Sequence, residues 1–516
     1  MNFSEKDTQF IQNYGLSIDE VNRQIAILKE GLPATEVLLA ATPQNGIEVL
    51  DEVTQKVLLQ KFDADKKKYD LQKFVPASGA ATRMFKDWVF FHHNYQVGKD
   101  FYERFIKKHQ LSTFPEYLQD FLNDLPGYAF YQDLMDVLKK SNENIFQMDE
   151  NEQVWQYIRY ILSDDGLGYE KLPKAFLKFH RYSQNEQITA LEEHLKEAQA
   201  YALGKNKLAK VHFTISPQHE AAFIDLTNQL KEKYQVEITY SFQKPETDTL
   251  MIYADGQDLV RDEKEHIVFR PGGHGALIDN IQDLDADIIF VKNIDNVQKG
   301  DKQTDTLLYK KILGGYLMQL MEKNKLFLEK LRDEKPIHEE LQIIVDFAKN
   351  EMNINFIEGF DTLNNSGKRK YLAYKLNRPI RIAGMVKNTG EPGGGPFWAK
   401  DKNDLKSLQI VEKAQIDTSD SNQNKILASS THFNPVDLVL STKDFEENKY
   451  DLKEFINEKA AFLNDKSYKG KEVKVYERPG LWNGAMDAWN TIFIEVPITT
   501  FSPVKTVVDL LKDAHQ

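Results

Sequence analysis

Residues 71–85, LQKFVPASGAATRMF, decide the fold. A short apolar run ends in small residues and is followed by a helix-like pattern, which is typical of a strand, a tight loop and a helix. The small residues at 78–81 let backbone N–H groups approach an anion closely. A following helix would add the positive end of its dipole, and Arg83 is a bidentate phosphate donor. The alternative is a tight turn in which small residues serve packing alone.

C-terminal to this stretch, from residue 208 on, short runs rich in β-branched and aromatic residues alternate with helical stretches. The alternation predicts an α/β fold, with a mostly parallel (mixed), doubly wound sheet between helices on both faces, in three layers. Helical insertions are expected at residues 87–171 and about 300–370. The predicted strands are residues 211–215, 236–242, 249–254, 266–269, 287–293, 378–386, 408–412, 436–440, 472–476 and 491–496.

The N-terminal residues 1–70 read as helices. Apolar side chains recur there near the 3.6-residue period, and Ser17 with Glu20 is a capping-box pattern. We therefore expect a helical N-terminal segment at 1–70, followed by one α/β domain at 71–516.

Composition narrows the function classes. The 516 residues are 41% hydrophobic and 28% charged, enough apolar content for a packed core. A net charge of −13 argues against general binding to nucleic acid or anionic membranes. The absence of cysteine excludes disulfides, thiolate nucleophiles and cysteine zinc sites. No apolar run approaches the ~20 residues that span a bilayer, and the start lacks a secretory pattern. We expect a cytoplasmic protein.

Two further segments complete the chemical signals. The run Pro271-Gly272-Gly273-His274-Gly275 fits a loop on which a flat ligand rests against bare backbone, or an ordinary surface turn. The run 287–296 delivers Asp295 and Asn296 at the C-terminal end of a buried-looking strand, where open α/β sheets bind ligands. A carboxylate there suits Mg²⁺, and a helix N-cap is the alternative. The common P-loop, dinucleotide, zinc-protease and serine-hydrolase motifs are absent from the sequence.

In this order, these segments resemble the UDP-sugar pyrophosphorylase branch of the GT-A-like nucleotidyltransferases, as a divergent bacterial member. That family carries a G-G-x-G-T-R-[LM] loop, then P-K-[AG], P-G-G-[NH]-G, [VI]-D-N and F-x-P-[VL]-K segments. The matching positions are Gly79, Thr82, Arg83 and Met84, then Pro173-Lys174-Ala175, residues 271–275, Ile294-Asp295-Asn296, and Phe501 to Lys505. The resemblance covers about residues 71–515.

The resemblance implies a reaction in which a nucleoside triphosphate and a sugar 1-phosphate give a nucleotide sugar and pyrophosphate. By that resemblance, Arg83 would neutralise the departing pyrophosphate, Lys174 the α-phosphate region, and Lys505 the sugar phosphate. Asp295 would bind Mg²⁺. The same resemblance implies nucleotide contacts at Ser78, Gly79, Ala80, Ala81, Thr82, Gln243, Gly272, Gly273, His274 and Gly275, and sugar contacts at Glu412 and Asn434.

Two alternatives stay open. Ser78 and Ala81 stand where the family prefers glycine, which keeps a non-catalytic nucleotide-binding or nucleotide-sugar-binding protein of the same fold possible. A GT-A glycosyltransferase would use a D-x-D pair; Asp285-Ala286-Asp287 has that spacing but precedes its strand. The base, the sugar and the oligomeric state stay open.

Overall fold

A mixed sheet forms the centre of the computed structural model, which describes residues 3–94, 107, 121–141, 144–256, 258–333, 336–391 and 393–516. Its strand order is β2-β3-β19-β12-β16-β11-β4-β7-β8, and β15 pairs with β12 at the side. Only β16 in that order runs antiparallel to both neighbours, so the predicted mostly parallel, mixed sheet is confirmed. The strands are β2 Thr42–Pro43, β3 Gly46–Glu48, β19 Asn490–Glu495, β12 Ile380–Lys387, β16 Leu438–Ser441, β11 Ile288–Val291, β4 Leu71–Pro76, β7 Ala209–Ile215, β8 Val236–Phe242 and β15 His432–Phe433.

The strand order reverses between β4 and β11. From β4 the chain adds β7 and β8 on one side, and then returns to place β11 on the other side of β4. In open α/β sheets the loops that follow the two strands at such a reversal are the usual ligand-binding place. Here those loops are 77–85 and 292–299, the two segments that the sequence singles out.

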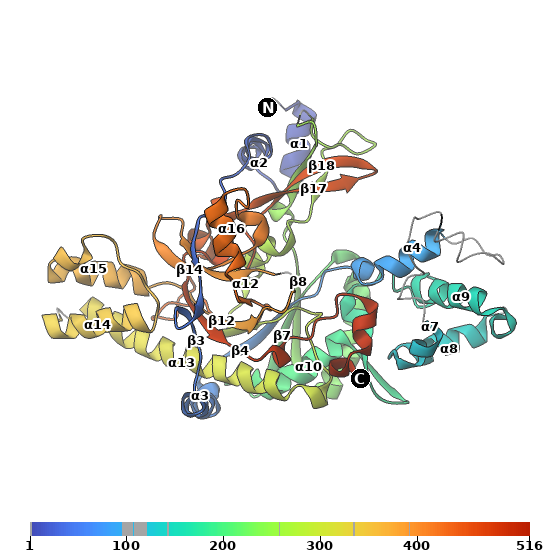
Figure 1. Ribbon diagram of the computed structural model, residues 1–516, viewed down its shortest axis with the longest axis horizontal. Helices are drawn as coiled ribbons and strands as arrows, with labels where there is room; N and C mark the ends of the chain where they lie inside the picture. The colour runs from blue at the N-terminus through green and yellow to red at the C-terminus, as the bar shows by residue number, and fades with distance from the viewer. Residues whose placement is uncertain are drawn as a thin grey trace.

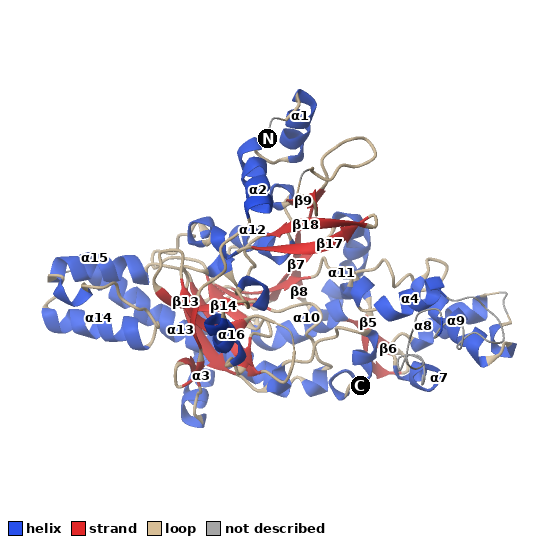
Figure 2. Ribbon diagram, turned by 45° about the horizontal axis from the view of Figure 1, so that its top comes forward, coloured by secondary structure: helices blue, strands red, loops and turns tan. Residues whose placement is uncertain are grey.

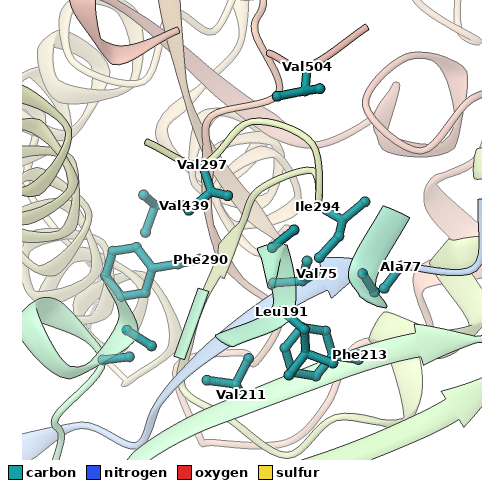
Figure 3. Packing of buried hydrophobic residues seen from close by; sticks show 14 of the residues in the cluster. Val75, Ala77, Leu191, Val211, Phe213, Phe290, Ile294, Val297, Val439 and Val504 are labelled. Carbon is teal, nitrogen blue, oxygen red and sulfur yellow. The ribbon is translucent and has the colours of Figure 1, made fainter. Parts of the chain in front are cut away.

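Helices cover both faces of the sheet, as expected for three layers. Neighbouring residues of β11 point to opposite faces because a strand alternates its side chains: Phe290 packs in one core cluster and Ile289 in the other. The Phe290 side contains α3 Glu52–Asp65, α10 Ala190–Tyr201, α11 Glu220–Tyr234 and α13 Thr304–Asp333; the Ile289 side contains α12 Leu277–Asp283. Figure 3 shows Val75, Phe290, Ile294 and Val504 in the first of these clusters.

Two helical groups project from opposite sides of the sheet (Figure 1). The predicted insertion at about 300–370 consists of α13 with α14 His338–Asn350, and continues into α15 Asn365–Leu376. The predicted insertion at 87–171 contains α4 Lys86–Asn94, α7 Phe121–Asp124, α8 Tyr131–Lys140 and α9 Glu150–Leu162. Its residues 95–106 and 108–120 lie outside the described part of the chain.

The prediction of helices throughout residues 1–70 is wrong at 37–48. Helices α1 Glu5–Tyr14, α2 Ile18–Glu30 and α3 are present, but β1 Val37–Ala40, β2 and β3 lie between them. Strand β3 pairs with β19, and β1 pairs with β13 Gly395–Lys400, which in turn pairs with β14 Lys406–Val411. These strands depend on partners some 350 to 450 residues away, as their registers show, so local periodicity carries no sign of them.

A smaller antiparallel sheet takes two of the predicted strands away from the centre. Its order is β10-β9-β18-β17, with β9 Thr249–Tyr253, β10 Phe269–Arg270, β17 Phe462–Tyr468 and β18 Lys471–Glu477. Helices α1 and α2 lie beside this sheet (Figure 2), and both share a core cluster with it. The remaining elements are the hairpin β5 Lys178–Ser183 and β6 Glu186–Thr189, and the helix α16 Ser421–Ala428. Among the described residues, no helix is long and apolar enough to cross a membrane.

Candidate active site

The loop after β4 is held by backbone pairing on both sides. Ala77 N–H donates to Thr214 O on β7 (2.9 Å), and Ala81 N–H donates to Leu172 O (3.1 Å). Ala80 forms a β-bridge with Pro173, which fixes Lys174 beside the loop. Between these anchors, the N–H groups of residues 78–80 donate to no backbone carbonyl of the described chain. Three consecutive amides on a loop with exposed Gly79 and Ala80 are therefore available to a ligand.

Lys174, Asp295 and Lys505 meet at this loop. Lys174 Nζ lies 2.9 Å from Asp295 Oδ2, and Lys505 Nζ lies 3.2 Å from the same oxygen. Lys174 Nζ also donates to Val504 O at 2.7 Å. The side chains of Lys174 and Asp295 are 12% and 13% exposed, whereas that of Lys505 is 57% exposed. One carboxylate therefore balances two ammonium groups, one buried and one open to solvent.

The charges of this cluster shift each other's protonation. Burial lowers the pKa of Lys174 by more than the attraction of Asp295 raises it, and repulsion from Lys505 and Arg83 lowers it further. Burial alone would raise the pKa of Asp295, but the two lysines hold it below its ordinary value. Arg83 itself is exposed and forms no hydrogen bond or ion pair with the described residues. The cluster thus carries an excess of positive charge around one carboxylate, with a free guanidinium beside it.

Backbone contacts explain how Lys505 reaches a loop more than 200 residues earlier. Val504 N–H donates to Asp295 O (2.9 Å), and Ser502 N–H donates to Asn296 Oδ1 (3.0 Å). His194 Nε2 bonds Ile294 O (3.1 Å) from α10. No described helix begins at Asp295 or Asn296, because the next turn starts at Gly300 and α13 at Thr304. The N-cap alternative is therefore not what these residues do.

Sequence reasoning missed two buried networks behind the cluster. Lys73 and Lys292 share Glu197 at 3.0 and 2.7 Å, and burial lowers the pKa of Lys73 to about 7 although Glu197 opposes it. The second network joins Glu193, His180 and His515, all at most 1% exposed. No sequence signal marks either network, since isolated lysines and histidines on strands look like surface or core residues.

The second network ties the segment after Lys505 to the body. His180 Nδ1 lies 2.7 Å from Glu193 Oε2, and His180 Nε2 lies 2.9 Å from His515 Nδ1. Burial, and then repulsion from His180, lowers the pKa of His515 to about 3, against a backbone hydrogen bond to Ser502. Ser502 belongs to the segment that carries Lys505, so the network holds that segment against the rest of the fold.

A second group brings together several residues expected at the nucleoside and sugar. His274 stacks on Trp482 with ring centroids 4.2 Å apart, and its Nε2 lies 3.8 Å from Glu412 Oε1. Asn483 donates to the same Glu412 oxygen at 3.0 Å. The amide of Gln243 donates to Gly273 O, which places it at this loop.

The glycines of this loop have a packing reason. A Cβ on Gly272 would lie 2.4 Å from Thr247 O, and one on Gly275 would lie 2.6 Å from Pro479 O. A Cβ on Gly79, in contrast, would meet nothing within 4 Å. Asn434 is 4% exposed, its side-chain amide donates to Gly384 O and its side-chain carbonyl accepts from Val436 N–H. Both polar ends of Asn434 are thus engaged by backbone.

The fit of a magnesium ion depends on Asp295. Among the described residues no three His, Asp or Glu side chains gather as ligands. Mg²⁺ is commonly held in proteins by one or two carboxylates plus substrate phosphates, so a single carboxylate is compatible with it. Both lysines contact Oδ2, and Oδ1 makes no hydrogen bond with the described chain. Asp295 therefore offers one free oxygen, suited to a metal that arrives with phosphate.

Comparisons with solved structures return UDP-sugar enzymes at low similarity. A UDP-N-acetylglucosamine pyrophosphorylase from Trypanosoma brucei has 11% identity and a TM-score of 0.45, covering 95% of this chain and 72% of its own. A UDP-glucose pyrophosphorylase from Leishmania major has 12% identity and a TM-score of 0.42, covering 99% and 79%. Among curated proteins no match is found. A family model described as "Domain of unknown function (DUF4301)" matches residues 4–516. The chain therefore belongs to the DUF4301 family.

Proposed function

We propose that this protein is a nucleotidyltransferase, which joins a nucleoside triphosphate and a sugar 1-phosphate into a nucleotide sugar and releases pyrophosphate. The observation that carries the proposal is the cluster at the strand-order reversal: Lys174 and Lys505 on one Asp295 oxygen, with Arg83 beside them. Cations with free amides and no acid–base pair suit phosphoryl chemistry, in which positioning and charge neutralisation do most of the work.

The chemistry needs one bond made and one broken. An oxygen of the sugar phosphate attacks the α-phosphorus of the triphosphate, and the bond from that phosphorus to the oxygen bridging to the β-phosphorus breaks, so pyrophosphate leaves with its electron pair. No proton has to move, because the nucleophile is already an anion. Lys174, buried beside the loop, would hold the α-phosphate, and the exposed Lys505 would hold the incoming sugar phosphate.

Arg83 and the loop after β4 would bind the pyrophosphate that leaves. Arg83 has no partner among the described residues, so its fork is free for the departing pyrophosphate. The three unbonded amides at 78–80 would take the remaining phosphate oxygens. Asp295 would hold Mg²⁺, which would supply further charge neutralisation. The His274, Glu412 and Gln243 group would bind the nucleoside and sugar. A cytoplasmic location and a bacterial source belong to the same proposal.

The glycosyltransferase alternative loses support from the position of its acidic pair. Asp285 and Asp287 precede β11, at the opposite end of the strand from Asp295, and both pair with Lys443 at 3.2 and 2.9 Å. Binding without turnover remains the second candidate, favoured by the three amides, which need only a phosphate and no chemistry.

One assay tests the proposal. Purified protein is incubated with Mg²⁺, each of the four common nucleoside triphosphates and a panel of sugar 1-phosphates, and pyrophosphate release is measured. We expect release with at least one pair, and a loss of about 10²–10³-fold in kcat/KM for Lys174→Met. The matched control is Lys443→Met, since Lys443 is 15% exposed and pairs with an aspartate at the other edge of the sheet. Nucleotide binding with no release for any pair would contradict the proposed reaction.

A further inference from the structure

A polar cavity lies at the opposite edge of the central sheet from the candidate active site. It is about 30 Å³ in volume, and its wall contains Lys375, Arg378, Asp401 and Asp487. Lys375 and Arg378 lie at the end of α15, directly before β12, and Asp487 lies shortly before β19. The cavity therefore sits where the α14–α15 helices meet the N-terminal ends of β12 and β19, whereas Asp295 follows the C-terminal end of β11.

Two cations in this wall are buried without a bonded counter-ion. Lys375 is 5% exposed and its ammonium forms no hydrogen bond or ion pair within the described residues. Arg378 is 7% exposed, and its one hydrogen bond runs to the carbonyl of Ala488 at 3.3 Å. The Lys375 ammonium lies 5.8 Å from the centre of the Tyr371 ring, and the Arg378 guanidinium lies 4.7 Å from the centre of the Tyr374 ring. Burying a charge without a counter-ion is costly, and proteins ordinarily supply one. The wall of this cavity thus holds two buried cations, close enough to repel each other, whose neighbours are aromatic rings rather than carboxylates.

The two carboxylates of the wall are committed elsewhere. Asp401 Oδ1 accepts the backbone N–H groups of Asn403 and Leu405 at 2.8 and 3.0 Å. Asp487 accepts from Lys402 N–H at 2.8 Å and from Asn457 at 3.2 Å, and burial raises its pKa to about 6. Neither carboxylate contacts Lys375 or Arg378 as an ion pair in the part of the chain that the structure describes.

The electrostatics of Lys375 agree with an incomplete site. Burial lowers the pKa of Lys375 to about 8; the next cause is repulsion from Arg378, and the opposing attraction of Asp401 is smaller than both. A group that binds here should therefore bring negative charge. The cavity volume of about 30 Å³ limits that group to a small one.

We propose that this cavity binds a small oxyanion, two of whose oxygens accept from the Lys375 ammonium and the Arg378 guanidinium. Both residues line the cavity, and a guanidinium together with an ammonium is the pairing that proteins use for phosphate and carboxylate. Inorganic phosphate and a carboxylate share this chemistry, and the experiment separates them. The site lies apart from the candidate active site and does not depend on the proposed reaction.

The test uses the full chain in chloride buffer free of other oxyanions, titrated calorimetrically with inorganic phosphate, sulfate or acetate, with the unfolding temperature followed in parallel. We expect at least one anion to bind and to raise the unfolding temperature. Lys375→Met should weaken that binding at least tenfold, and should itself raise the unfolding temperature in chloride because the unpaired charge is gone. Preference for phosphate and sulfate over acetate, or the reverse, identifies the class.

Lys505→Met is the matched control, because phosphate would also be drawn to the cations of the candidate active site. Binding that is lost in Lys505→Met but unchanged in Lys375→Met would overturn the proposal, as would no binding of any of the three anions at 50 mM. If Lys375→Met does not fold, Arg378→Lys serves instead: it keeps the charge and removes the fork. Binding within twofold of the original in a folded Arg378→Lys would then overturn the site.

Discussion

The two edges of the central sheet differ in whether their cations are paired with a carboxylate of the chain. At the C-terminal end of β11, Lys174 and Lys505 share the carboxylate of Asp295. At the N-terminal ends of β12 and β19, Lys375 and Arg378 share a cavity with no bonded carboxylate between them. Elsewhere pairing is the habit: Lys73, Lys292 and Lys443 all have acidic partners. The difference teaches that one edge keeps its counter-ion in the chain, while the other leaves it to a solute.

The largest effect is expected for Arg83, whose charge should matter for activity and not for the stability of the fold. Arg83→Ala should lower kcat/KM for pyrophosphate release by about 10²–10³-fold, because a free guanidinium beside the cluster would act only on bound phosphate. Its free energy of unfolding should stay within about 0.5 kcal/mol of the original, since the side chain is exposed and forms no hydrogen bond or ion pair with the described residues. Steady-state kinetics and thermal unfolding measure the two effects. A stability loss equal to the activity loss would mean that Arg83 is structural.

Removing the Asp295 carboxylate should lower the stability of the fold, because Lys174 would then be a buried cation without a counter-ion, as Lys375 is. Asp295→Asn keeps the shape of the side chain but leaves the buried Lys174 without a negative partner, and breaking such a pair costs about 3 kcal/mol. Chemical denaturation gives the value directly. The comparison breaks if Asp295→Asn is as stable as the original chain, for then the pairing contributes nothing to the fold.

The lowered pKa of Lys375 should make the free energy of unfolding depend on pH. Its pKa is lowered from an ordinary 10.5 to about 8, so between these values the folded chain holds fewer protons on Lys375 than the unfolded chain. Stability therefore rises with pH across that window and is lost as the pH falls from 10.5 to 8, by about 3 kcal/mol overall.

Denaturation curves at several pH values, compared with those of Lys375→Met, isolate this contribution because all other lysines cancel. The difference between the two proteins should be largest near pH 7 and vanish toward pH 10.5. A difference that does not change with pH would show that Lys375 is not the origin. Adding the anion that binds should flatten the dependence, since a bound oxyanion restores the charged form.

The smallest effect is expected at the exposed member of the shared pair. Lys505→Met should change the free energy of unfolding by less than about 0.5 kcal/mol, because its side chain is 57% exposed and Lys174 still balances Asp295. Its KM for sugar 1-phosphate should nevertheless rise. Equal stability losses in Lys505→Met and Asp295→Asn would contradict the unequal roles given to the two contacts of Asp295.

Sequence reasoning located the centre of the sheet because each of its strands has a recognisable local sequence pattern. The runs that became β4, β7, β8, β11, β12, β16 and β19 are short, β-branched or aromatic, and followed by turns. The same reasoning placed Asp295 at a strand end, and the family resemblance named Lys174 and Lys505. The structure adds that both lysines contact the same oxygen of Asp295. The strands β1 and β3 were missed because each pairs with a strand from a distant part of the chain. The strand β13 was missed although it also pairs with the nearby β14.

Part of the candidate active site could be predicted from the sequence, because some of its residues belong to motifs and others are positioned only by contacts in the folded chain. Loop residues that carry a motif, such as Arg83 and Lys505, could be named from order along the chain. The pairing of Pro173 with Ala80, which brings Lys174 to the loop, is a backbone contact without a side-chain pattern. Arg378 begins the predicted strand at 378–386, and no sequence pattern marks Lys375; only their burial in the structure reveals that these two charges lack a bonded counter-ion among the described residues.

The two joined imidazoles near the end of the chain make the position of Lys505 depend on residues that follow it. His180 contacts both the Glu193 carboxylate and His515, and His515 also hydrogen-bonds the backbone of Ser502. Glu193, His180 and His515 are at most 1% exposed, so these contacts are shielded from solvent. A substitution at His515 should therefore disturb the segment that carries Lys505, although His515 lies further along the chain.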